Sequence, residues 1–353
     1  MNKTTSVYLD AWRIIAACVV LLAHVNDWGG QAIPFFTPAV ASQGVLIFFV
    51  LSGFVISYVV TRREGDWRSY AVARAARIYS VALPAIALTF LIDAVAPPLP
   101  HWIVDDTAVT AAPLQALAGL TFLNELWSHH IQLGSNSPYW SMGYEVPFYI
   151  CFGLALFLQR GRKWLVLLAI AIYGPRIAIM GTIWLMGAAT QLVCRRRLVG
   201  RGAGIVLFVA SMAVIMTVNA LVWFGMMSWT DSPIFWHRLR DLPADFLIAT
   251  AFAAGIVGID AACRGMTPPA GLARAIQWWA GCTFTLYLFH VPLSQALVGL
   301  SPALLRGSGG VVTLLVAIVL VTLAIAELTE RRKVWWHALF ARLLRPRSER
   351  AAA

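Results

Sequence analysis

The chain has 353 residues, of which 60% are hydrophobic and only 12% are charged. Soluble domains are about one quarter charged, so this composition cannot cover a water-facing surface and excludes an ordinary soluble protein. The formal net charge of +11 comes from basic residues clustered between apolar runs. That pattern fits the positive-inside rule better than nucleic-acid binding, so we expect a membrane protein that lies in a lipid bilayer and binds no nucleic acid.

Apolar stretches of about twenty residues recur along the chain, the length that crosses the hydrocarbon core as a helix. The first begins like a signal peptide, but Asp10 and Arg13 interrupt the apolar run that must precede cleavage, so we expect a retained span. The predicted fold class is all-α, a polytopic membrane helical bundle of about ten transmembrane helices. The expected spans lie near residues 7–25, 45–61, 79–96, 139–158, 164–174, 176–194, 203–225, 244–262, 280–299 and 310–328.

The basic residues divide unevenly between the two ends of these spans. With a cytoplasmic N-terminus, most of the 27 Lys and Arg residues fall in cytoplasmic loops, which places both termini in the cytoplasm. Segment 114–127 is apolar but too short to cross, and we expect a re-entrant or interfacial helix on the outer face. Residues 1–335 then form a single integral-membrane domain, and residues 336–353 form a basic cytoplasmic tail.

The five cysteines are scattered along the chain, with no CxxC pair and no His at metal-ligand spacing. The sequence therefore indicates neither a disulfide framework nor a metal site. The simpler interpretation is that they are small apolar residues.

Two ionisable residues, Arg13 and His24, lie in the first expected span, where such groups are costly and are therefore functional candidates. Their spacing closes about three helical turns, so both side chains project from one face, about 16 Å apart along the axis. An imidazole titrates near neutral pH and suits a general base. The structural alternatives are that His24 meets headgroups or a neighbouring helix, and that Arg13 snorkels or pairs with Asp10.

A carboxylate, Glu145, follows Trp140 and Ser141 at the outer end of the fourth expected span. If Ser141 caps that helix, Glu145 lies one turn inside, at about the depth of His24. A buried carboxylate needs a partner, and orienting the imidazole of His24 would supply one. Asp27, one turn beyond His24, could orient the imidazole in place of Glu145. Alternatively, Glu145 is exposed to water in a vestibule and has no such role.

Three further residues are candidates for binding. Arg74 and Arg77 precede the third expected span, and residues three apart on a helix share a face from which two guanidinium groups can grip a phosphate. Alternatively, Arg74 and Arg77 do no more than set the membrane topology. His290 lies in the middle of the ninth expected span, where an imidazole must line a cavity or bond a neighbouring helix.

Five strings in this order give the chain a resemblance to the acyltransferase 3 family of integral-membrane acyltransferases. The first span reads LDAWRIIAACVVLLAH, with Arg13, ten intervening residues and then His24, and the second contains FFVLSGFVIS. Arg74 and Arg77 match the Arg-x-x-Arg pair of the family, YWSMGYEVPFY resembles its Trp-Ser-Leu-Ser-x-Glu element, and TFTLYLFHVPL resembles its Tyr-Leu-x-His-x-Pro string. The chain departs from the family pattern, without losing a candidate catalytic group, at Ala11, Trp12, Ile14, Gly143 and Val146.

The resemblance implies an O-acyltransferase that moves an acyl group, acetyl above all, from a cytosolic acyl-CoA to a hydroxyl of a sugar, glycan or other small acceptor. Acyl-CoA would be a cosubstrate, with no tightly bound cofactor and no metal, and the location would be the bacterial inner membrane. The site residues implied are catalytic His24, Glu145 and Arg13, acyl-donor-binding Arg74, Arg77 and Ser52, and substrate-binding Trp140, Ser141 and His290.

Two other classes of function stay open at this point. A proton-coupled transporter or flippase of a lipid-linked sugar could use Arg13, His24 and Glu145 as a proton relay, although no inverted repeat or discontinuous helix is evident in the sequence. A membrane sensor or scaffold has no need of three ionisable groups inside the bilayer. The acceptor, the acyl chain length, an acyl-histidine intermediate and the oligomeric state are also open.

Overall fold

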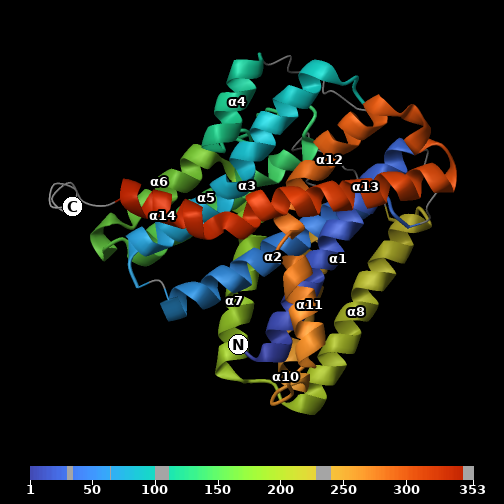
Figure 1. Ribbon diagram of the computed structural model, residues 1–353. Coiled ribbons are helices and arrows are strands. Elements are labelled where there is room, and N and C mark those ends of the chain that lie inside the picture. The colour runs from blue at the N-terminus through green and yellow to red at the C-terminus, as the bar shows by residue number, and fades with distance from the viewer. Residues whose placement is uncertain (30–34, 64, 100–110, 228–239, 345–353) are drawn as a thin grey trace.

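The computed structural model describes residues 1–29, 35–63, 65–99, 111–227 and 240–344, and this part of the chain is a bundle of helices with no strand (Figure 1). The all-α polytopic expectation is therefore confirmed. Within the described ranges, eight helices are long and apolar enough to cross a membrane, the last of them counted with its continuation. They are α1 (Lys3–Trp28), α2 (Pro38–Arg63), α3 (Trp67–Val95), α7 (Pro175–Arg196), α8 (Arg201–Trp223), α10 (Leu242–Ala262), α12 (Thr283–Leu300) and α13 (Gly307–Leu328).

Two of the ten expected spans are shorter than the bilayer is wide. The range 139–158 forms a 3₁₀ turn, Ser137–Ser141, followed by the 16-residue helix α5 (Met142–Phe157), and the range 164–174 forms the 10-residue helix α6 (Trp164–Tyr173). A helix needs about twenty residues to span the hydrocarbon core. The break after α6 occurs at Gly174, whose φ of 93° leaves the helical region, and Pro175 then begins α7.

Three further short helices complete the described chain. Helix α4 (Ala112–Thr121) falls in the segment expected to be re-entrant or interfacial, and its ten residues are too few to cross. Helix α11 (Ala270–Ala280) packs against α1. Helix α14 (Lys333–Leu343) continues the line of α13 in Figure 1 and packs against α3, so the first part of the expected tail is a docked helix. The rest of that tail, residues 345–353, lies outside the described residues.

Helix α1 lies at the centre of the bundle, in contact with α2, α10, α11 and α12. This position buries Ala16, Ala17, Val20 and Leu21 and places the Arg13 side of α1 against α2 and α12. Helix α3, which carries Arg74 and Arg77, is capped at its N-terminus by Asp66, whose carboxylate accepts hydrogen bonds from the amides of Arg68 and Ser69. The hydrogen bond from Ser69 is the largest cause that lowers the pKa of Asp66.

The backbones of α2 and α7 touch because both helices present a glycine at their contact. A Cβ atom built on Gly53 would lie 1.9 Å from the carbonyl oxygen of Trp184, and one on Gly187 would lie 2.0 Å from that of Val50. Small residues allow such close approach of membrane helices, whose association depends on van der Waals packing.

The substitution Gly53→Ala should therefore force α2 away from α7 and lower stability by about 1–3 kcal/mol. Thermal unfolding of the purified protein in detergent measures this as a fall in Tm. Gly202→Ala in α8 is the control, since a Cβ there meets nothing within 4 Å. Equal Tm values for the two variants would contradict the close contact.

Candidate functional site

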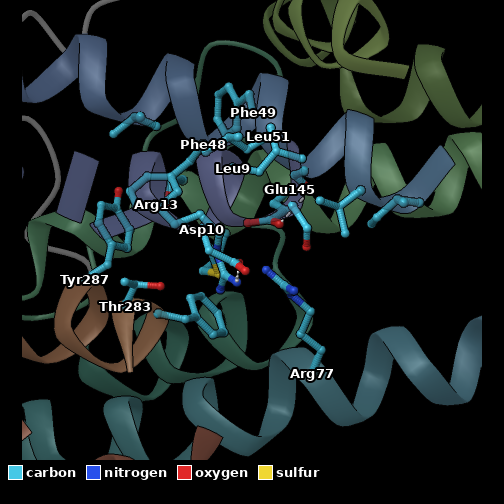
Figure 2. A pocket seen from close by; sticks show the side chains of 18 of the residues that line it. Leu9, Asp10, Arg13, Phe48, Phe49, Leu51, Arg77, Glu145, Thr283 and Tyr287 are labelled. Atoms are coloured by element: carbon cyan, nitrogen blue, oxygen red, sulfur yellow. Dashed lines mark hydrogen bonds and ion pairs between the residues drawn. The ribbon is translucent and has the colours of Figure 1, made fainter. Parts of the chain in front are cut away.

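A cavity of about 160 Å³ lies where α1, α2, α3, α5 and α12 meet. Four charged side chains line it: Asp10, Arg13, Arg77 and Glu145. Figure 2 shows Asp10, Glu145 and Arg77 directed into the same space from three different helices. Most of the remaining wall is apolar and includes Leu9, Phe48, Phe49, Leu51 and Tyr287. Charged groups in a low-dielectric wall can bind a polar reactant strongly.

Arg13 is held between two carboxylates rather than extended toward the membrane surface. Its Nη1 lies 3.6 Å from Oδ1 of Asp10, and its Nη2 lies 3.7 Å from Oε1 of Glu330. Glu330 is fixed in turn, because its Oε2 accepts hydrogen bonds from the backbone amide (3.0 Å) and the hydroxyl (3.1 Å) of Thr285. Sequence reasoning missed Glu330, although a lone acid inside the basic run ERRK is a visible signal.

Glu145 does not orient His24, so that expectation is wrong. Among the described residues the carboxylate accepts hydrogen bonds from the hydroxyls of Ser52 (3.0 Å) and Tyr149, and the indole of Trp184 donates to Ser52 (3.2 Å). The physical reason is depth: Glu145 lines the same cavity as Arg13, whereas His24 lies about 16 Å further along α1. Asp27, the competing orienter, makes no hydrogen bond to His24 in the described structure.

The partner of His24 is His290 on α12. Nδ1 of His24 lies 2.9 Å from Nε2 of His290, and the two rings are stacked at 5.1 Å between centroids. Trp28 stacks on the ring of His24 at 5.8 Å. His290 was expected to bind substrate, but its ring is buried and contacts the other imidazole.

The hydrogen bonds of His290 define the tautomers of the pair. Its Nδ1 lies 3.1 Å and 2.9 Å from the carbonyl oxygens of Leu286 and Tyr287, which can only accept, so Nδ1 carries the proton. In the neutral ring Nε2 is then an acceptor, and it receives the Nδ1–H of His24. The basic lone pair of His24 is thereby assigned to Nε2, as in a histidine oriented by a carboxylate.

Tyr287 adjoins both the charged cavity and the histidine pair. Phe48 and Tyr287 both line the cavity and pack edge to face at 5.6 Å. The ring of Tyr287 is also 6.3 Å from that of His290, and its hydroxyl donates to the carbonyl of Pro138 (3.0 Å). The cavity therefore ends against the residues that adjoin His290, and His24 is not part of its lining.

Arg74 and Arg77 line different cavities, and both guanidinium groups lie near the side chain of Tyr149, which borders the two. Arg77 faces the charged cavity. Arg74 lines an apolar groove of about 590 Å³ between α3 and α5, where it lies over the rings of Tyr70 (5.6 Å) and Tyr149 (6.0 Å). Three residues on a helix subtend about 300°, so the two side chains leave α3 about 60° apart and reach its two neighbouring spaces.

The two residues expected to bind substrate beside Glu145 have structural contacts. Ser141 does not cap α5 with its side chain; its hydroxyl donates to the carbonyl of Pro138 (3.1 Å), and the residue lines the charged cavity. Trp140 packs edge to face against Phe49 and Tyr144. Within the described ranges no group of three or more His, Cys, Asp and Glu residues is placed to hold a metal ion.

Comparison with known proteins gives the family of the chain. The family model described as "Acyltransferase domain" matches residues 6–330, so the chain belongs to the acyltransferase 3 family of multi-pass membrane proteins. The chain is also 28% identical over 183 residues to a protein of Shigella phage Sf6 named "O-acetyl transferase". That similarity covers 49% of this chain and 52% of the relative, so it spans about half of the relative's length. No solved structure matches the chain.

Tyr149→Phe should destabilise the protein by about 1–3 kcal/mol, because it leaves the carboxylate of Glu145 without one of its two hydroxyl donors. Chemical unfolding in detergent measures the change. Tyr173→Phe is the matched control, since the hydroxyl of Tyr173 forms no hydrogen bond with any described residue. A loss of the same size in both variants would mean that the Glu145 network contributes nothing.

Proposed function

We propose that this protein is a membrane-bound O-acyltransferase that moves an acetyl group from cytosolic acetyl-CoA to a hydroxyl of a sugar or glycan, in the bacterial inner membrane. Membership of the acyltransferase 3 family and the relative named "O-acetyl transferase" support the reaction class. The observation that carries the proposal is the His24–His290 contact, whose hydrogen-bonding pattern assigns the basic lone pair of His24 to Nε2.

In the proposed reaction Nε2 of His24 removes the proton of the acceptor hydroxyl. The oxygen attacks the carbonyl carbon of the thioester, a new C–O bond forms, and the C–S bond breaks. The coenzyme A thiolate leaves and takes up a proton, which His24 can return. General-base assistance of this kind is typically worth about 10²–10⁴-fold in rate.

The charged cavity is the proposed route of the acyl donor. Arg13 and Arg77 line it on the side of α1 and α3 where the basic loops begin, and its far end is the Phe48–Tyr287 pair next to His290. A thioester that arrives at this end meets the imidazole pair once the two rings give way. His290 acts as a positioning residue here, since it holds the proton of His24 on Nδ1.

His24→Ala should lower turnover of labelled acetyl-CoA by about 10²–10⁴-fold while the protein still folds. Purified protein in nanodiscs, given surface glycans from a strain that lacks the gene, allows both release of free coenzyme A thiol and label transfer to be measured. Asp27→Asn, which lies one turn away, is the control and should keep the wild-type rate. Binding of a lipid-linked sugar with no thioester turnover in the wild type would support the transporter instead.

The positioning role of His290 can be separated from a packing role by two variants. His290→Leu removes the acceptor for Nδ1–H of His24 and should reduce kcat by about 10²-fold or more with little change in the KM for acetyl-CoA. His290→Gln supplies a carbonyl oxygen as a new acceptor and should restore part of kcat. Equal kcat values for the two variants, or a change in KM alone, would rule out the assignment.

A further inference from the structure

A second polar cavity, of about 420 Å³, lies where the two residues that precede α1 meet the ends of α2, α7 and α10. Four arginines line it, from three different parts of the chain: Arg62, Arg195, Arg197 and Arg264. None of these arginines belongs to the strings that identify the family. The positive-inside rule explains why basic residues lie on this side of the membrane, but it does not require them to line one cavity. We call this group the arginine cavity.

The local contacts leave the arginine cavity with a strong excess of positive charge. Arg62 lies over the ring of Tyr58 at 6.0 Å, and Arg264 donates to the carbonyl of Val199 at 3.3 Å, so each is directed by a neighbour that carries no charge. One carboxylate lines the cavity, Asp260, and it already accepts a 2.7 Å hydrogen bond from the hydroxyl of Thr5. Several guanidinium groups around one hollow favour a ligand with more than one phosphate.

The arginine cavity adjoins the charged cavity that contains Arg13 and Glu145. Met1, just before α1, lines both cavities. Along α2 the linings interleave, with Ser52 and Ile56 facing the charged cavity and Phe54 and Tyr58 facing the arginine cavity. A ligand with an anionic head in one space and a slender arm reaching into the other would fit this arrangement.

We propose that the arginine cavity binds the phosphate-bearing nucleotide end of the acyl-CoA donor, while its pantetheine arm passes Met1 into the charged cavity. This inference rests on the proposed acyl-CoA function. It assigns the nucleotide to arginines other than Arg74 and Arg77, which face the apolar groove and the reaction cavity. Arg77 then lies beside the pantetheine arm, between the nucleotide and the thioester.

The test uses adenosine 3′,5′-bisphosphate, which carries phosphates but has no thioester, and full-length protein in nanodiscs of phosphatidylcholine, which offer no anionic headgroup. The double variant Arg62→Gln/Arg197→Gln removes two of the four guanidinium groups and keeps an arginine directly beside each position, so the charge that sets topology remains. The Kd measured by calorimetry should rise at least about tenfold. Arg160→Gln/Arg162→Gln, in an exposed basic turn elsewhere, is the matched control and should leave the Kd unchanged.

A second measurement separates this proposal from the proposed function. The double variant should raise the KM for acetyl-CoA about as much as the Kd, with kcat retained and with turnover of S-acetyl-pantetheine, which has no phosphate, unaltered. Wild-type turnover of acetyl-CoA together with an unchanged Kd in the double variant would overturn the arginine cavity and leave the acyltransferase standing. Tight binding of the bisphosphate, lost in the double variant, without turnover of either thioester would support the cavity and overturn the reaction.

Discussion

A permanent positive charge in the middle of an apolar bundle is the constraint on which the rest of this structure depends. A guanidinium group cannot lose its proton to escape burial, so Arg13 must be paired. Asp10 comes from the same helix, but Glu330 comes from the opposite end of the chain and is itself fixed by Thr285. One ion cluster thus joins α1, α12 and the turn that follows α13, and its members Asp10 and Arg13 line the adjoining cavity together with Arg77 and Glu145.

The sequence predicts the bundle well because apolar length is a local property. Helices α1, α2 and α3 follow from runs of about twenty apolar residues. Helices α5 and α6 form where apolar runs were expected, but they are too short to cross the hydrocarbon core. The candidate site could be predicted from the sequence only in part. Arg13 and His24 share a face by helical period, but whether Glu145 or His290 meets His24 depends on how three helices are staggered. No periodicity contains that information.

The histidine pair also shows how an imidazole can be oriented inside a membrane without another buried charge. A carboxylate in this position would have to be taken out of water together with its partner, which is costly in a low-dielectric interior. His290 does the same work as a neutral ring, because the carbonyls of Leu286 and Tyr287 hold its proton on Nδ1. The helix backbone of α12, rather than an acid, therefore sets the orientation of His24.

Tyr149 belongs to two compartments of opposite character. One side of its ring forms part of the wall of the apolar groove between α3 and α5, while its hydroxyl donates to Glu145 in the charged cavity. A hydrocarbon chain bound in that groove would contact the ring of Tyr149, whose hydroxyl is hydrogen-bonded to the carboxylate of Glu145. A lipid or detergent chain bound there would therefore act on the polar interior through one side chain, and changing the solubilising agent would change the surroundings of the carboxylate.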